Sequence, residues 1–231
     1  MRQISLSIVI MAYNEAENLP KLLPLVYAWA DRHSRLSDFE IIVVDDGSSD
    51  ATAEVVGSFR PGDGRVVLKQ HQKNRGMGAA IRTGYGAARC EYVTQLPADL
   101  QVLPETLDLF LPHVPEHDLV LSVYERRGDG LKREVLSLGY HGLARLIMGR
   151  RCDYTGTMVL RRSLLESVAI RSDSFVANLE FPLKALARGA THAVVEFRPL
   201  PRASGESKVL GGRRIAWVAM ELLRLRLRGV D

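Results

Sequence analysis

The sequence predicts an α/β fold with a central, mostly parallel β-sheet flanked by helices. Short β-branched runs alternate with longer helical patterns over the first 100 residues, and this order favours parallel strands joined by right-handed crossovers. The runs are almost continuously apolar, as in strands that are covered on both faces. Polar clusters follow three of these strands, and open α/β sheets bind ligands at the carboxyl ends of their strands.

Local signals place each element in turn. In the first half, strands are expected at 4–11, 39–44, 65–69 and 92–96, and helices at about 17–33, from 51, and from the glycine-rich turn 74–80 to about 88. Gly47 permits a sharp turn after the second strand, and Ser49 or Asp50 is expected to cap the next helix. In the second half, strands are expected at 119–124, 157–160 and 193–198, and helices at 133–148, 180–188 and 213–228.

The composition is that of an ordinary globular chain of 231 residues, with 46% hydrophobic residues, 25% charged residues and a net charge of +4. The length and the lack of repeats or linkers predict one domain over residues 1–231. No dense basic face with a readable motif is present, so no nucleic-acid partner is expected. Cys90 and Cys152 have no metal-like spacing, and no apolar run reaches the roughly 18 residues of a membrane span. A cytoplasmic location is therefore expected.

A carboxylate and an amide stand just past the strand expected at 92–96. These are Asp99 and Gln101, and in an extended segment residues i and i+2 point to the same side. Mg²⁺ or Mn²⁺ on a diphosphate takes one or two protein oxygens and fills its other positions with water and phosphate. The pair is therefore a candidate metal site. The alternative is that Asp99 is an ordinary turn or helix-capping residue.

Six short motifs follow one another along nearly the whole chain. They are Ala12-Tyr13-Asn14-Glu15, Val44-Asp45-Asp46-Gly47-Ser48-Ser49-Asp50, Asn74-Arg75-Gly76-Met77-Gly78, Ala98-Asp99-Leu100-Gln101, Asp153-Tyr154-Thr155-Gly156, and Arg202 through Gly205 to Ser207-Lys208. In this order they resemble the inverting, GT-A-fold family 2 glycosyltransferases. The closest resemblance is to the dolichol-phosphate mannosyltransferase and polyprenyl-phosphate glycosyltransferase branch.

The resemblance implies a nucleotide-sugar half at about 1–101, an acceptor half at about 102–212 and a C-terminal amphipathic helix at about 213–228. It implies that the nucleotide sugar is bound by Ala12, Tyr13, Glu15, Val43, Asp45, Ala98, Asp99, Gln101, Arg202 and Lys208. Asp99 and Gln101 would hold the divalent metal, and Asp99, Arg202 and Lys208 would be the catalytic residues. A turn-capping role for the Asp45-Asp46 pair, and solvated surface charge for Arg202 and Lys208, are the alternatives.

The resemblance also implies an acceptor. A polyprenyl phosphate is already anionic, so it needs cations to hold it in line rather than a general base. Arg127, Arg133 and Ser137 are the candidates, and Arg133 and Ser137 share a helix face at four residues' spacing. Arg127 could equally be surface charge. The favoured reaction is transfer of mannose from GDP-mannose to a polyprenyl or dolichyl phosphate.

Three positions depart from the family pattern. Pro97 stands where the family has its first metal-site acid, Tyr124 where it has an arginine, and Ala12 where it has a proline. Two other functions are therefore kept open. One is transfer to a saccharide or small molecule, for which Asp153 or Glu180 would be the base. The other is a weakly active subunit that binds a nucleotide sugar.

The last helix is basic and amphipathic, which indicates peripheral contact with the cytoplasmic membrane face. At 100° per residue its polar side holds Arg213, Arg214, Glu221, Arg224 and Arg228. Ile215, Val218, Leu222, Leu223, Leu225 and Leu227 cover the rest, with Arg226 and Trp217 as exceptions. The alternative is that this helix packs on the sheet and completes the core.

Overall fold

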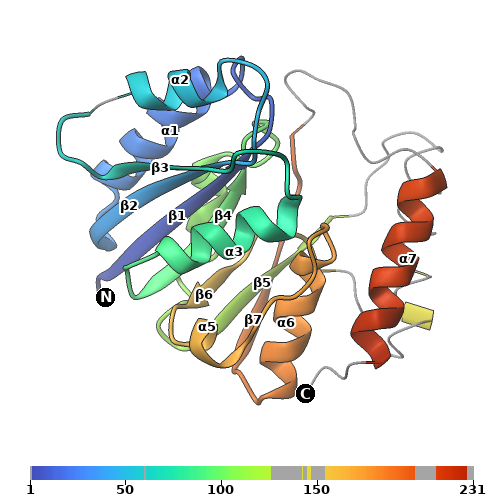
Figure 1. The fold of residues 1–231 in the computed structure, drawn as a ribbon. Helices are drawn as coiled ribbons and strands as arrows, with labels where there is room; N and C mark the ends of the chain where they lie inside the picture. Colours follow the sequence, from blue (N-terminus) through green and yellow to red (C-terminus); the bar gives the residue numbers. More distant parts are fainter. Residues whose placement is uncertain are drawn as a thin grey trace.

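A computed structural model of the chain describes residues 2–59, 61–125, 142, 145–146, 154–200 and 212–227, with side chains of the last helix from residue 219 onward. In these ranges the α/β prediction is confirmed: one mostly parallel sheet is covered by helices on both faces (Figure 1).

The strands of the described residues form a single seven-stranded sheet in the order β3-β2-β1-β4-β6-β5-β7. Their bounds are β1 Ile4–Ala12, β2 Leu36–Asp45, β3 Val66–Gln70, β4 Tyr92–Pro97, β5 Leu119–Tyr124, β6 Val159–Arg161 and β7 His192–Phe197. The β6 strand runs antiparallel to both of its neighbours, β4 and β5, whereas the other pairings are parallel.

Helices lie on both faces of this sheet. Their bounds are α1 Leu19–Arg32, α2 Thr52–Ser58, α3 Met77–Ala87, the 3₁₀ helix η1 Pro104–Leu109, α5 Leu164–Ser167, α6 Ala177–Ala187 and α7 Gly212–Leu227. Successive strand residues point to opposite faces, so Ile8 of β1 packs in the cluster with α1, and Val9 packs in the cluster with α3 and α6.

The α7 helix packs against the body of the protein through one side. Leu222 and Leu225 are buried, and the carboxylate of Glu221 accepts hydrogen bonds from the hydroxyls of Ser172 and Ser174. Glu221 and Arg224, two residues of the expected polar side, line the same pocket, so this part of the polar side faces the body of the protein. Residues of α6 and α7 line one pocket, and Met220, Leu223 and Leu227 of α7 are exposed.

Candidate functional site

The parallel register brings the ends of four strands to one edge of the sheet. Ala12 pairs with Asp45, Asp45 pairs with Gln70, and Met11 pairs with Pro97. The polar segments that follow β1, β2 and β4 therefore leave the same edge, as the sequence predicts, and this edge is the usual ligand-binding position in an open α/β sheet.

Asp45 closes the turn at the end of β2. Its side chain is fully buried, Oδ1 accepts the Ser48 N–H at 2.9 Å, and Oδ2 accepts the Gln70 amide at 3.1 Å. These bonds agree with a turn residue, and contact with a nucleotide stays a prediction. The expected cap of α2 by Ser49 or Asp50 is wrong, because Ala51 is the N-cap residue and makes no side-chain cap. Asp50 Oδ1 accepts the Thr52 N–H at 3.0 Å.

The loop after β1 is tied to the same turn. Asn14 has a left-handed backbone with φ of 53°, which asparagine tolerates better than most residues. Its N–H donates to Ser48 Oγ at 2.8 Å, and its Oδ1 accepts the Ser49 N–H at 2.9 Å. The N–H of Glu15 donates to Thr52 Oγ1 at 2.9 Å. These bonds fix the backbone of the first predicted binding motif.

The other nucleotide-sugar residues expected at the ends of β1 and β2 differ in exposure. Tyr13 and Glu15 are partly exposed at the carboxyl edge, whereas Ala12 is buried in the strand that leads there. Val43 has no exposed surface and packs in the apolar cluster beneath α1. The structure therefore places Val43 in the core rather than at the edge.

Asp46 holds the glycine-rich turn in place, a role that the sequence analysis did not find. Its carboxylate contacts His71 Nδ1 at 2.7 Å and accepts the N–H groups of Arg75 at 2.9 Å and Gly76 at 2.8 Å. The other ring nitrogen of His71 lies 2.9 Å from Thr83 Oγ1. Gly76 has a left-handed φ of 91°. Asp46 and His71 are both buried, so this network fixes the turn between β3 and α3.

Asp99 lies in a turn rather than in an extended segment. The β4 strand ends at Pro97, and Leu100 has a left-handed φ of 59°, which is unusual for a residue of this size. Asp99 Oδ1 accepts the Gln101 N–H at 3.2 Å. The reasoning that Asp99 and Gln101 face one side because the chain is extended is therefore wrong. A turn, and not a strand, sets the relation of the two side chains.

The same turn is joined to the chain after β7. The carbonyl of Gln101 accepts the Leu200 N–H at 2.8 Å, and Gln101 Nε2 donates to the Leu200 carbonyl at 3.3 Å. Leu200 stands two residues before Arg202 in the sequence. These hydrogen bonds hold Leu200 at the Asp99 turn. The segment that is predicted to close over the phosphates begins two residues later.

Several predicted site residues lie outside the described residues. They are Arg127, Arg133, Ser137, Asp153, Arg202 and Lys208.

The turn at Asp99 and Gln101 offers one carboxylate and one amide oxygen as potential ligands of a cation. Within the described ranges, no three His, Cys, Asp or Glu side chains gather into a metal-binding group. Pro97 has neither a side-chain oxygen nor a backbone N–H. This set fits a hard divalent cation that takes its remaining ligands from a diphosphate and water.

A buried amide network that no sequence motif indicates is centred on Gln95 of β4. Gln95 accepts the Tyr85 hydroxyl at 2.9 Å and donates to the Gly156 carbonyl and to Asn178 Oδ1, the latter at 2.7 Å. Burial raises the pKa of Tyr85 above its ordinary value, so the hydroxyl stays a donor at neutral pH. A Cβ at Gly156 would lie 2.8 Å from the Asn178 amide. The glycine of the Asp153–Gly156 motif therefore permits close packing of the first turn of α6.

Glu180, one of the two candidate bases, is fully engaged. It is 2% exposed, Oε1 accepts Lys184 Nζ at 2.6 Å, and Oε2 accepts the N–H groups of Arg171 at 3.0 Å and Ser172 at 2.8 Å. A general base must reach the proton that it removes. A buried carboxylate with both oxygens occupied is poorly suited to that role.

The strand order, the reversed β6 strand and the polar carboxyl edge define a GT-A-type α/β fold. Residues 7–169 match the family described as Glycosyl transferase family 2, and the chain belongs to that family.

Curated relatives carry names that concern a lipid acceptor. The chain is 33% identical over 226 residues to an undecaprenyl-phosphate 4-deoxy-4-formamido-L-arabinose transferase of Pseudomonas paraeruginosa, covering 95% of this chain and 62% of the relative. A protein of the same name from Edwardsiella ictaluri is 31% identical over 194 residues, covering 77% and 59%. This chain therefore spans about three fifths of the length of these relatives.

Solved structures share the fold at low sequence identity. Glucosyl-3-phosphoglycerate synthase of Mycobacterium tuberculosis superposes with a TM-score of 0.71 at 18% identity, covering 97% of this chain and 79% of that one. Mannosyl-3-phosphoglycerate synthase of Rubrobacter xylanophilus gives a TM-score of 0.70 at 20% identity, covering 97% and 73%. Of the helices in the described part of the chain, none is long and apolar enough to cross a membrane.

Proposed function

We propose that this chain is the transferase domain of an inverting enzyme that moves a sugar from a nucleotide sugar onto undecaprenyl phosphate or a related polyprenyl phosphate. The observation that carries the proposal is the 33% identity, over 95% of this chain, to a protein named for transfer to undecaprenyl phosphate. Because the chain spans only part of its relatives, the proposal concerns the transfer step alone.

The donor in this proposal is a UDP-linked sugar. The resemblance seen in the sequence implied GDP-mannose, but the curated relatives are named for 4-deoxy-4-formamido-L-arabinose. Two of the solved neighbours were crystallised with UDP or UDP-glucose together with Mn²⁺. We therefore favour a UDP-linked 4-formamido-arabinose over GDP-mannose.

The proposed reaction is a single displacement. An oxygen of the lipid phosphate attacks the anomeric carbon while the bond from that carbon to the nucleoside diphosphate breaks on the opposite side. The attacking oxygen is already anionic, so no side chain has to remove a proton. The engagement of Glu180 in an ion pair with Lys184 is consistent with such an acceptor.

Cations then have to hold two anionic reactants in line. Arg127, Arg133 and Ser137 are proposed to bind the acceptor phosphate. Arg202 and Lys208 are proposed to stabilise the charge that develops on the departing diphosphate. The hydrogen bonds between Gln101 and Leu200 support the second assignment, because they tie the start of that segment to the Asp99 turn.

Asp99 and Gln101 would hold a divalent metal, either Mg²⁺ or Mn²⁺. When bound, the metal would neutralise charge on the departing diphosphate. The chain itself offers one carboxylate, so we expect metal affinity to depend on the nucleotide.

Two other functions have specific observations behind them. Transfer to a small molecule is favoured by the solved neighbours that were crystallised with phosphoglyceric acid, although the occupied Glu180 argues against a hydroxyl acceptor. The single carboxylate beside Pro97 suits a weakly active subunit that binds a nucleotide sugar.

Transfer of radiolabelled sugar to undecaprenyl phosphate in detergent tests the proposal. A screen of thermal stabilisation by UDP, GDP and their sugars, with and without Mn²⁺, selects the donor, because a ligand that binds only the native state stabilises it. The Asp99→Ala variant should lose roughly a thousandfold or more in transfer rate while it keeps the folded circular dichroism spectrum of the wild type.

Glu166→Ala, which removes an exposed carboxylate from α5, is the matched control and should transfer normally. Near wild-type turnover in Asp99→Ala would contradict the metal assignment. Nucleotide binding without any turnover would favour the binding subunit, and label on a hydroxyl compound instead of the lipid would favour the second enzyme function.

A further inference from the structure

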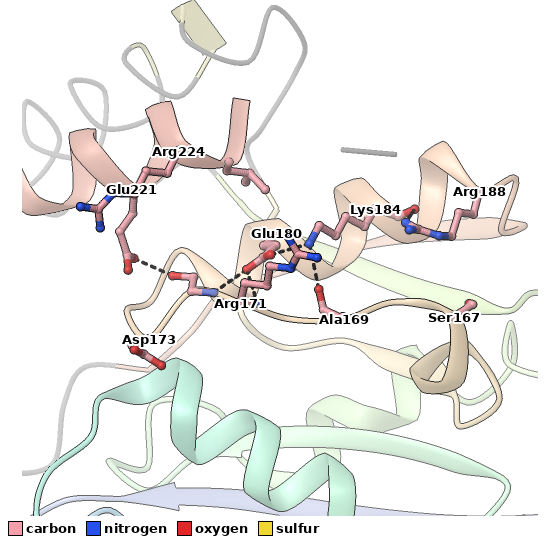
Figure 2. Close-up of a pocket in the computed structure, with 11 residues that line it drawn as sticks. Ser167, Ala169, Arg171, Asp173, Glu180, Lys184, Arg188, Glu221 and Arg224 are labelled. Atoms are coloured by element: carbon pink, nitrogen blue, oxygen red, sulfur yellow. Dashed lines mark hydrogen bonds and ion pairs between the residues drawn. The ribbon is translucent and has the colours of Figure 1, made fainter. Parts of the chain in front are cut away.

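A polar pocket of about 320 Å³ lies between α6, α7 and the segment 167–173 (Figure 2). None of the residues that leave the carboxyl edge of β1, β2 or β4 lines it. Four cationic side chains take part in its wall, namely Arg171, Lys184, Arg188 and Arg224. The pocket is thus a basic site that shares no lining residue with the described residues of the candidate nucleotide site.

The three carboxylates of this pocket are already satisfied. Glu180 pairs with Lys184 at 2.6 Å, as drawn in Figure 2. Glu221 accepts the hydroxyls of Ser172 and Ser174, and Asp173 forms an ion pair with Arg82. The ion pairs offset the charges of Glu180 and Asp173. Glu221 keeps its negative charge, which the three arginines of the pocket wall outnumber.

Arg171, Arg188 and Arg224 remain exposed. In the described part of the chain, no ion pair engages any of the three. The Arg188 guanidinium donates to the Lys184 carbonyl of its own helix at 3.3 Å. Guanidinium groups match the oxygens of a phosphate with paired N–H donors, so three available arginines around one pocket suit a phosphate group.

An exposed apolar face of α7 runs beside the pocket. Met220 is 44% exposed, Leu223 is 49% exposed and Leu227 is 84% exposed. Their spacing of three and four residues puts them on one side of the helix. Arg224, which lines the pocket, follows Leu223 directly and lies between the apolar face and the pocket side of the helix.

We propose that this pocket binds the phosphate headgroup of an anionic membrane lipid while the Met220–Leu227 face of α7 rests in the interfacial layer. A free phosphate ion would use the arginines but would leave the apolar face in water, so the lipid explains both features. The proposed transfer reaction does not require this site. The site would instead hold the protein at the surface from which a lipid acceptor is taken.

Vesicle sedimentation tests the proposal with the full chain. Wild-type protein should bind phosphatidylcholine vesicles that contain phosphatidylglycerol and should bind pure phosphatidylcholine weakly. A basic residue near an anionic surface contributes about fivefold to binding, so the combined Arg171→Gln, Arg188→Gln and Arg224→Gln variant should lose on the order of 100-fold in partitioning.

The matched control changes three exposed cations elsewhere: Lys21→Gln, Arg32→Gln and Arg162→Gln. The control variant has the same net charge as the pocket variant. Equal losses of vesicle binding in the two variants would mean that general charge attraction, and not the pocket, holds the protein on the vesicle. Leu223→Ser with Leu227→Ser should also weaken vesicle binding, and unchanged binding would overturn the apolar contact.

Inorganic phosphate and glycerol 3-phosphate are the soluble probes. Stabilisation of the wild type by either probe at millimolar concentration, without vesicle binding, would overturn the lipid as the occupant. Transfer to a detergent-dispersed acceptor should stay normal in the pocket variant. The pocket variant should also be stabilised by the nucleotide to the same extent as the wild type. This measurement separates a failure of the lipid proposal from a failure of the proposed transfer function.

Discussion

Glu40 is a buried carboxylate of β2 that joins β1 to the loop before β4. Burial alone would raise its pKa, but hydrogen bonds outweigh burial. Ser7 Oγ and the Arg89 N–H each donate at 2.6 Å, and Arg89 Nε donates at 3.0 Å. Together they hold the pKa of Glu40 below its ordinary value of 4.5.

The lowered pKa predicts a loss of stability in acid. The folded state binds the proton less readily than the unfolded state, so the stabilisation is complete above about pH 4.5 and is lost as the pH falls through the folded pKa. Glu40→Gln should be less stable at neutral pH and should show a flatter decline in urea midpoint below about pH 4.5. Glu166→Gln, at an exposed site, should keep the wild-type slope, and a wild-type slope in Glu40→Gln would contradict the assignment.

Pro97 is the second residue that carries a prediction. It occupies the last position of β4, two residues before Asp99. Pro97→Asp would give the cation a second carboxylate, so we expect Mn²⁺ affinity in the presence of UDP to rise by roughly tenfold or more. Calorimetric titration measures it, and Pro112→Asp, at an exposed site away from the strand end, adds the same charge as a control.

If Pro97 serves only to shape the end of β4, the result should differ. Its ring keeps Leu96 extended, so the aspartate would lower stability and leave metal affinity unchanged. That outcome would mean that the metal does not lie beside residue 97, and the binding-subunit function would gain support.

At the scale of elements, the start of α3 depends on a close backbone approach. A Cβ at Gly78 would lie 2.0 Å from the Ser172 carbonyl oxygen, and the Gly78 N–H donates to the Asp173 carbonyl at 3.0 Å. We expect Gly78→Ala to lower the free energy of unfolding by about 1–3 kcal/mol, because the segment 172–173 must move.

Gly86→Ala is the control in the same helix. A Cβ at Gly86 meets nothing within 4 Å, so this change should be neutral or stabilise the helix by up to about 1 kcal/mol. Urea denaturation compares the two variants. Equal changes in the free energy of unfolding would mean that the close approach of Ser172 does not require a glycine at position 78.

The sequence predicted most elements because their signals are local. The apolar runs of β1 and β5 gave their positions to within a residue. It did not predict that β6 runs antiparallel between β4 and β5, because pairing direction depends on contacts between distant segments. The short helix α5 and the 3₁₀ helix η1 were also missed, since neither is long enough to show a helical period.

The site was predictable to a similar extent. Motif order located Asp45 and Asp99 at the carboxyl edge, but periodicity could not reveal that Leu100 turns the chain between Asp99 and Gln101. The roles of Asp46 and Gln95 depend on backbone groups and amides far away in the sequence. A single polar residue in a strand or turn carries no signal of such partners.

On the scale of the whole molecule, the boundary expected near residue 101 between a nucleotide half and an acceptor half is not a boundary in the core. The β4 strand pairs with β1 of the first half and with β6 of the second. One apolar cluster contains both Ile8 of β1 and Val195 of β7, and the other contains both Val9 and Phe181. Both halves therefore share one sheet and two continuous apolar layers.

This sharing predicts that the chain unfolds as one cooperative unit. Trp29 lies in α1 and Trp217 lies in α7, so the single-tryptophan variants Trp217→Phe and Trp29→Phe each report on one end of the chain. We expect the two fluorescence transitions in urea to coincide with each other and with far-ultraviolet circular dichroism, as two-state unfolding requires. An earlier transition of Trp217 alone would mean that α7 is a separate unit despite the burial of Leu222 and Leu225. An earlier transition of Trp29 would mean that the part of the sheet next to α1 unfolds separately, and it would contradict the single domain.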